Sequence, residues 1–162
     1  MSELPVLLLS GVNLNLLGSR EPAIYGSHTL EDLVALAQRT GEKLGISVVH
    51  QQTNFEGELV ELIHGARGTT AAIVINPGAF THYSYALRDA LGAYEAPVIE
   101  LHISNPARRE EFRHNSVVAP VAAGTIAGFG ADGYRLAIEA VAAILRPTVT
   151  DPGTTSQESS HA

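Results

Sequence analysis

Five short apolar runs alternate with longer segments of helical periodicity, and this alternation constrains the fold more than any other feature of the sequence. A strand–helix–strand order places successive strands parallel in one sheet, with the connecting helices packed on its faces. The expected strands are residues 5–10, 46–50, 71–76, 97–104 and 124–129. We therefore expect an α/β protein with a central parallel sheet.

The segments between these runs carry the start signals of helices. Residues 30–44 place apolar side chains on one stripe, with Thr29 as the capping residue and Asp32 three positions later. Residues 56–66, 84–91 and 132–145 are the other expected long helices. Asn105-Pro106 has the cap-plus-proline form of a helix start, and it predicts a short helix that continues through Glu110 and Phe112.

Five strands with alternating helices suggest a flavodoxin-like, doubly wound sheet of strand order 2-1-3-4-5. The 162 residues are sufficient for one domain with a proper core, which we expect over residues 1–146. Residues 147–162 are rich in Thr, Ser, Gly and Pro and have little apolar surface to bury, so we expect a disordered tail.

The composition excludes several classes of function. A net charge of -7 argues against a surface for nucleic acid or anionic membranes. The chain has no cysteine, which rules out thiolate nucleophiles and Cys-ligated zinc. Lys43 is the only lysine and lies late in an amphipathic helix, a poor position for Schiff-base chemistry. The amino-terminal residues lack a basic leader pattern, so we expect a cytoplasmic location.

The fourth apolar run carries an ionisable pair. Because side chains alternate along a strand, Glu100, His102 and Ser104 should share one face. A carboxylate two residues from a histidine supports the charged imidazole, which suits a general acid. A satisfied structural pair at a strand end would give the same pattern, so the pair alone does not decide between the two interpretations.

Other polar residues follow strands that should end beside this one. Asn13, Arg20 and Tyr25 come after the first strand, and Asn76 and His82 after the third. Ligands of such sheets bind beyond the carboxyl ends of the strands, near the point where the strand order reverses. The sequence therefore predicts a site at this edge.

The connection after the first strand, residues 11–28, is long for a segment between a strand and a helix, which usually has about 2–6 residues. A flavin or phosphate site would require a short Gly/Ser/Thr turn that opens directly into the helix, and a phospho-acceptor would require acidic residues at the strand end. This segment has neither feature. We therefore interpret this connection as a lid. Metal binding by His82, His102 and Asp89 is conceivable but lacks a close ligand spacing.

With these positions assembled, the chain resembles the type II 3-dehydroquinate dehydratases over about residues 5–145. The resemblance rests on several blocks in the right order: Asn13, Arg20-Glu21-Pro22, Tyr25-Gly26, Asn76-Pro77-Gly78-Ala79, Thr81-His82, Leu87-Arg88-Asp89, His102-Ile103-Ser104-Asn105 and Glu110-Glu111-Phe112-Arg113. It implies a flavodoxin-like dodecamer of four trimers that needs no cofactor or metal. The reaction implied is dehydration of 3-dehydroquinate to 3-dehydroshikimate, in the shikimate pathway or in quinate catabolism.

The resemblance also implies a role for each matching residue. Tyr25 matches the family's base, Arg20 its partner on the lid, and His102 the general acid. Glu100 corresponds to the acid that partners this histidine, and Asn13 to the asparagine that helps hold a water near the developing enolate. The positions implied to bind substrate are Asn76, His82, Ile103, Ser104, Arg113 and Asp89, the last of which reaches the site of a neighbouring subunit.

The implied dehydration explains why a tyrosine and an arginine would be needed together. An ordinary tyrosine has a pKa of about 10, so it is a poor base unless a nearby cation favours the phenolate. A guanidinium within about 4–6 Å lowers the pKa of an acid by about 1–3 units, and Arg20 and Arg113 are the candidates.

The chain also departs from the family pattern. Ser10-Gly11-Val12-Asn13 stands where Asn-Gly-Pro-Asn is usual, and loss of the proline frees the backbone just before Asn13. These departures support one rival hypothesis, a non-catalytic paralogue that binds a quinate-like ligand. A second rival, a flavodoxin-like electron carrier, is disfavoured by the long lid.

Overall fold

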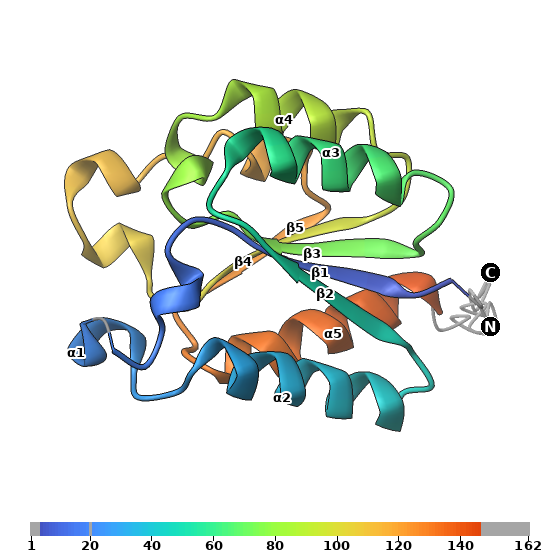
Figure 1. Ribbon diagram of the computed structural model, residues 1–162, viewed down its shortest axis with the longest axis horizontal. Coiled ribbons are helices and arrows are strands. Elements are labelled where there is room, and N and C mark those ends of the chain that lie inside the picture. The colour runs from blue at the N-terminus through green and yellow to red at the C-terminus, as the bar shows by residue number, and fades with distance from the viewer. Residues whose placement is uncertain (1–3, 20, 147–162) are drawn as a thin grey trace, which may run out of the picture.

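A five-stranded sheet lies at the centre of the computed structural model, which describes residues 4–19 and 21–146. The strands are β1 (Val6–Ser10), β2 (Val48–Gln52), β3 (Ala72–Asn76), β4 (Val98–His102) and β5 (Gly124–Ala127). All pairs are parallel and the order is β2-β1-β3-β4-β5, as predicted (Figure 1). The carboxyl ends of the strands therefore meet at one edge.

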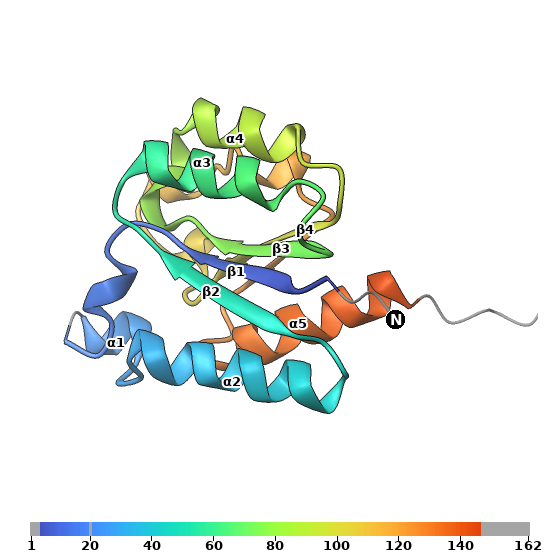
Figure 2. The same cartoon turned by 45° about the vertical axis from the view of Figure 1, so that its right-hand side comes forward.

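Helices cover both faces of this sheet. Helices α2 (Leu30–Lys43) and α5 (Asp132–Leu145) pack together on one face, and α3 (Glu56–Ala66) and α4 (Tyr85–Gly92) pack on the other (Figures 1 and 2). Each face has its own apolar cluster, one around Leu8, Val74 and Leu101 and the other around Leu9, Ile75 and Leu87. The sheet is therefore the middle of three layers.

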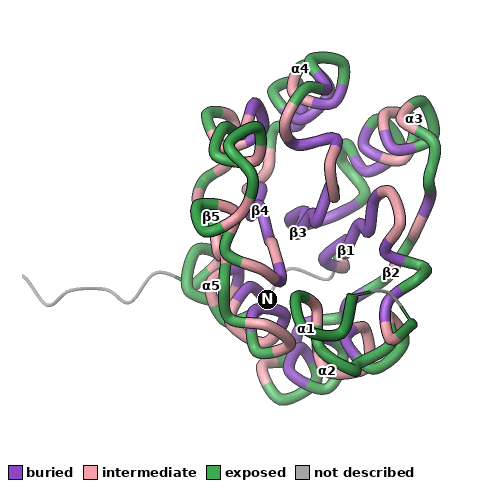
Figure 3. Tube along the Cα trace, turned by 90° about the vertical axis from the view of Figure 1, so that its left-hand side faces the viewer, coloured by how far each residue is buried: buried purple, intermediate pink, exposed green. Residues whose placement is uncertain are grey.

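Burial of the strands explains why the sequence gives such a clear signal. Every residue of β1 and of β3 is buried, because each strand has neighbours on both sides and helices on both faces. A strand in that position has to be apolar throughout, so it appears in the sequence as a continuous apolar run. Figure 3 views the molecule toward the ends of the strands, with the buried sheet enclosed by partly exposed helices.

The capping prediction for α2 is confirmed in atomic detail. The Thr29 hydroxyl accepts a hydrogen bond from the Asp32 amide, and the Asp32 carboxylate accepts one from the Thr29 amide. These two bonds satisfy donors that would otherwise be left without partners at the helix start, and they fix where the long connection after β1 ends.

Several strand boundaries differ from the predictions. The second strand begins at Val48 rather than at residue 46, because the Ile46 amide still bonds the Gly41 carbonyl at the end of α2. The fourth ends at His102 rather than at 104, and the fifth at Ala127 rather than at 129. Just past both ends, the Gly128 and Gly130 amides bond the carbonyls of His102 and Ile103.

The short helix predicted after Asn105 is not continuous. The chain forms two 3-10 helices instead, η3 (Pro106–Arg108) and η4 (Glu111–Arg113), with Arg109 extended between them. The start signal itself is correct, since the Asn105 side chain accepts from the Ala107 amide. The break turns the Arg109 side chain toward the end of the sheet, where it becomes part of the site described below.

The connection between β1 and α2 contains two short helices that periodicity did not indicate. They are the 3-10 helix η1 (Leu14–Leu16) and the single-turn helix α1 (Pro22–Tyr25). Two further 3-10 helices, η2 (Gly78–His82) and η5 (Ala119–Val121), follow β3 and precede β5. The tail predicted to be disordered, residues 147–162, lies outside the described residues.

Candidate active site

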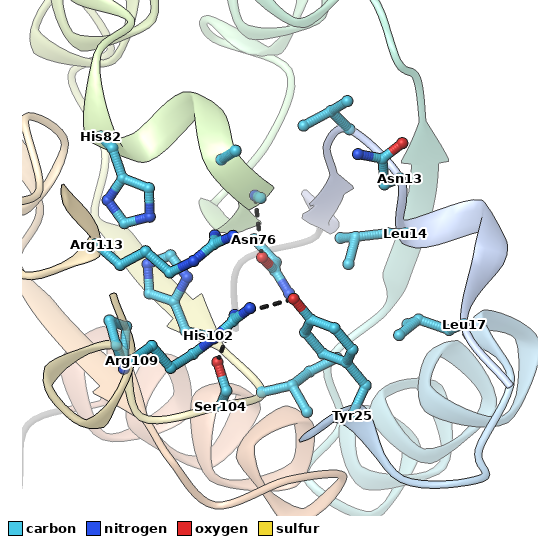
Figure 4. A pocket seen from close by; sticks show the side chains of 15 residues that line it. Asn13, Leu14, Leu17, Tyr25, Asn76, His82, His102, Ser104, Arg109 and Arg113 are labelled. Atoms are coloured by element: carbon cyan, nitrogen blue, oxygen red, sulfur yellow. Dashed lines mark hydrogen bonds between the residues drawn. The ribbon is translucent and has the colours of Figure 1, made fainter. Parts of the chain in front are cut away.

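A pocket opens at the carboxyl ends of β1, β3 and β4, where the strand order reverses (Figure 4). Its empty space, open mouth included, is about 660 Å³. The residues that line it come from the connection after β1, from η2, from the end of β4 and from η3 and η4: Val12, Asn13, Leu14, Leu17, Tyr25, Asn76, Gly78, Ala79, His82, His102, Ile103, Ser104, Pro106, Arg109 and Arg113. Most of the predicted site residues therefore meet in one place.

The ionisable pair on β4 has the predicted geometry. Nε2 of His102 lies 2.7 Å from Oε1 of Glu100, which is fully buried, while His102 itself lines the pocket. Glu100 does not line the pocket and acts from behind the imidazole. Leu101 and Ile103, which alternate with the pair, belong to the apolar cluster on the α2–α5 face.

Glu100 is held as an anion. Burial by itself raises the pKa of Glu100, but hydrogen bonds from His102, Thr81 and Ser116 and the charge of His102 outweigh it, so the pKa of this carboxyl lies below its usual value. An ionised Glu100 can accept the Nε2 hydrogen of His102 and thereby orients the ring that lines the pocket.

Across the pocket, the phenol of Tyr25 meets a guanidinium that the sequence analysis did not select. Nη1 of Arg109 donates to the Tyr25 oxygen at 2.9 Å and to Ser104 Oγ at 3.3 Å, and the guanidinium carbon lies 5.3 Å from the centre of the tyrosine ring (Figure 4). A cation that donates to a phenol oxygen stabilises the phenolate. Arg20, the predicted partner, lies outside the described residues.

A close approach of two backbone segments places Asn13. A side chain at Gly11 would collide with the Pro77 carbonyl oxygen, which would lie 2.3 Å from the added Cβ, so glycine allows the two connections to touch. Beyond it, Asn13 adopts a left-handed conformation (φ 66°), and its amide donates to Oδ1 of Asn54 at 2.9 Å. The Asn13 side chain thereby reaches the pocket.

The amide of Asn76 is oriented from two sides. Its Oδ1 accepts from the Gly78 amide at 3.2 Å, and its Nδ2 lies 3.5 Å from the hydroxyl oxygen of Tyr134 on α5. Burial raises the pKa of Tyr134 to about 12, so this phenol stays neutral. Asn76 therefore presents a fixed pattern of donor and acceptor at the end of β3.

His82 and Arg113 occupy the third side of the pocket. Nδ1 of His82 bonds the Asn115 carbonyl at 2.8 Å, and the ring stacks edge-on against Phe112. Burial is the main reason that the pKa of His82 is lowered, and the charges of His102 and Arg113 add to it. His82 is therefore neutral near neutral pH, whereas Arg113, paired with Glu110 at 2.7 Å, supplies positive charge.

The remaining predicted residues fall into two groups. Ile103 and Ser104 line the pocket, as expected. Asp89 lies exposed on α4 and is not among the lining residues, so any part it plays at a neighbouring site stays a prediction. In residues 4–19 and 21–146 no group of three or more His, Asp or Glu side chains is arranged to hold a metal ion.

A phenol with a cationic partner and an imidazole with an anionic partner thus line one pocket of a flavodoxin-like sheet, an arrangement suited to acid–base chemistry. The chain matches the model of the dehydroquinase class II family over residues 4–142. It therefore belongs to the class II dehydroquinase family, and at that level the resemblance stated from the sequence is confirmed.

Individual relatives agree with this assignment. The chain is 56% identical over 140 residues to the 3-dehydroquinate dehydratase of Pelotomaculum thermopropionicum, covering 86% of this chain and 96% of that protein. It is 57% identical over 134 residues to 3-dehydroquinate dehydratase 2 of Pseudomonas aeruginosa, covering 83% and 90% respectively.

Solved structures show the same fold. The type II dehydroquinase of Propionibacterium acnes superposes with a TM-score of 0.82 at 48% identity, covering 85% of this chain and 95% of that one. The enzyme of Butyrivibrio crossotus gives 0.84 at 46% identity, covering 87% and 99%. Among the described residues, no helix is both long and apolar enough to cross a bilayer.

Proposed function

We propose that the protein dehydrates 3-dehydroquinate to 3-dehydroshikimate by an anti elimination through an enolate intermediate, with Tyr25 as the base and His102 as the acid. One observation carries this proposal. The phenol held by Arg109 and the imidazole held by Glu100 line the same cavity, so a small ring bound there can meet a base and an acid at two different positions.

The first step is removal of a proton next to the ketone. The Tyr25 phenolate accepts this proton, and the guanidinium of Arg109, with Arg20 as its expected companion on the lid, stabilises the negative charge before transfer. Asn13 lies on the same side of the pocket, where its amide is suited to holding a water against the enolate oxygen.

The second step is loss of the β-hydroxyl group. The leaving oxygen takes a proton from His102. Since Nε2 is bonded to Glu100, Nδ1 is the ring nitrogen left to donate. Water and the conjugated enone are then the products. The site is reset when Tyr25 loses its proton to solvent and His102 takes one back at Nδ1.

Binding of the substrate is assigned to the other lining residues. Arg113 is the cation that can pair with the carboxylate. Asn76, the neutral His82 and the Ile103–Ser104 segment offer donors and acceptors for the ring hydroxyls. Closure of residues 11–28 over the bound ring would exclude water and strengthen each electrostatic interaction.

The test is an absorbance assay for the conjugated product with purified protein and 3-dehydroquinate. Wild-type protein should form the product, while Tyr25→Phe and His102→Ala should each lower kcat by orders of magnitude with an unchanged circular dichroism spectrum. Near-wild-type turnover by either variant would end the mechanism. Ligand binding without product in the wild type would favour the non-catalytic paralogue.

We also propose a homo-oligomer, a dodecamer of four trimers, in which Asp89 of one subunit completes the site of its neighbour. Its exposure on α4, outside its own pocket, is what such an arrangement requires. Sedimentation should give the mass of twelve chains. Mixing Asp89→Asn with Tyr25→Phe subunits should restore part of the activity, and a monomer with full activity would overturn this proposal.

A further inference from the structure

The carboxylate behind the acid is surrounded by hydroxyl groups that the mechanism above leaves unused. Ser116, in the segment between η4 and η5, is the first. Its Oγ accepts hydrogen bonds from the amides of Val118 at 3.1 Å and Ala119 at 2.9 Å, and these two bonds occupy its lone pairs. Its single hydrogen is therefore directed to Oε1 of Glu100, 2.8 Å away.

Thr81 of η2 is the second hydroxyl. It contacts both Oε1 of Glu100 and, at 3.0 Å, the Ser116 oxygen. Since the Ser116 oxygen already accepts two amides, the Thr81 hydrogen goes to the carboxylate. The Thr81 side chain is fully buried, and its backbone carbonyl is fixed by the Val117 amide at 2.8 Å. The donor is thus locked in place.

Every hydrogen-bonding partner of Glu100 among the described residues can donate to it. Thr81, Ser116 and His102 donate to Oε1, and Thr125 on β5 reaches Oε2 at 3.4 Å. An ionised carboxylate only accepts, so it can receive all four donors. A protonated one would lose a place for one of them and would have only Nε2 of His102 to accept its own hydrogen. The arrangement selects the charge state of Glu100.

We propose that Thr81 and Ser116 are positioning residues that hold Glu100 ionised and thereby keep the Nε2 hydrogen on the imidazole of His102. Without the hydroxyl donors the carboxylate would be more basic and would compete more strongly for that hydrogen, which weakens His102 as an acid. This inference rests on the proposed function only in assigning the acid to His102. The charge state of Glu100 can be measured without turnover.

Other charges near the pair are few and do not depend on these hydroxyls. Among the described residues, His82 from η2 interacts electrostatically with both members of the pair, and Arg113 from η4 interacts with His82. His82 is already neutral near neutral pH, and Arg113 stays charged. A change in the titration of Glu100 on removal of Thr81 or Ser116 can therefore be attributed to the lost hydrogen bond.

The experiment is an infrared titration of the buried carboxyl, combined with kinetics. The band of protonated Glu100 is identified as the one absent from Glu100→Gln. Thr81→Val removes a hydroxyl at nearly constant shape, Thr81→Ser restores it, and Ser116→Ala removes the second donor. Thr70→Val is the matched control, because it removes another buried threonine hydroxyl, bonded to Tyr94 and the Ala66 carbonyl away from the pocket.

In Thr81→Val and Ser116→Ala the Glu100 band should appear at a pH about one unit higher than in the wild type, the size expected for one lost bond to a charged group. In Thr81→Val, kcat should fall about tenfold or more, with KM changed less than threefold. Thr81→Ser should recover both properties and Thr70→Val should alter neither.

An unchanged Glu100 titration in Thr81→Val, or an equal loss of activity in Thr70→Val, would overturn the inference. If Thr81→Val fails to fold, Ser116→Ala compared with Ser116→Thr decides by the same two readouts. Wild-type protein without dehydratase activity but with the displaced titration in the variants would refute the proposed function and leave the hydroxyl donors established.

Discussion

Arg109 offers the sharpest test of the base, because its contact with Tyr25 can be removed without touching either reacting group. In Arg109→Met the phenol loses a charged donor at 2.9 Å and the cation that lies 5.3 Å from its ring centre. A hydrogen bond to a charged partner contributes about 1.5–3 kcal/mol, so loss of this one from the phenolate should lower kcat/KM roughly 10- to 150-fold. The effect should be mostly on kcat, because the lost interaction is strongest when the phenol is ionised.

The neighbouring arginine supplies the control. Arg108 is exposed and does not line the pocket, so Arg108→Met removes the same charge from the same segment and should keep kcat/KM within about twofold. The assay is initial-rate formation of the conjugated product at several substrate concentrations. If Arg109→Met keeps more than a third of wild-type kcat/KM, Arg109 does not stabilise the base.

Three further outcomes follow from the structure. The pKa of Glu100 is depressed in the folded state, so its contribution to stability is complete above the pH where an unfolded glutamate titrates, about 4.3, and is lost as the pH falls through the folded value. In urea unfolding, the free energy of unfolding of Glu100→Gln should therefore depend less on pH in the acid range than that of the wild type. An equal pH dependence in the two proteins would contradict the shift. Borohydride added with substrate should leave activity intact, since no imine forms, and mass spectrometry that found substrate reduced onto Lys43 would refute this. Asn54→Ala removes the acceptor of the Asn13 amide and should lower kcat/KM about three- to tenfold, a neutral hydrogen bond's worth, measured in the same product assay.

The fold could be predicted because its strongest constraints are local. The strands β1 and β3 are buried on both faces, so their composition alone marks them as interior strands. Edge strands do not give this signal. In β2 the pattern of burial alternates, and its last residues, Gln51 and Gln52, are polar, so periodicity placed the strand two residues too early.

The residues of the candidate site also divide into those that local sequence pattern reveals and those that it does not. Glu100 and His102 were found because a strand's two-residue period puts them side by side. Arg109 was not found, because its contact with Tyr25 joins positions 84 residues apart and depends on a break between two 3-10 helices that propensity does not reveal. The available signal was the cluster of three arginines after the acid strand, of which only Arg113 was assigned to substrate.

Ser10 and Val12, the two departures from the family's first block, are compensated by hydrogen bonds within this chain. Ser10, shorter than the usual asparagine, is fully buried and bonds Nε2 of His50 on β2 at 2.9 Å, so the polar end of β1 keeps a partner. Val12 lacks the rigid ring of proline, yet the next residue, Asn13, is fixed in its left-handed conformation by Asn54. A residue held by a backbone hydrogen bond does not need a proline before it to stay in place. Because these departures were the sequence support for a non-catalytic paralogue, and neither disturbs the pocket, the structure favours the enzyme.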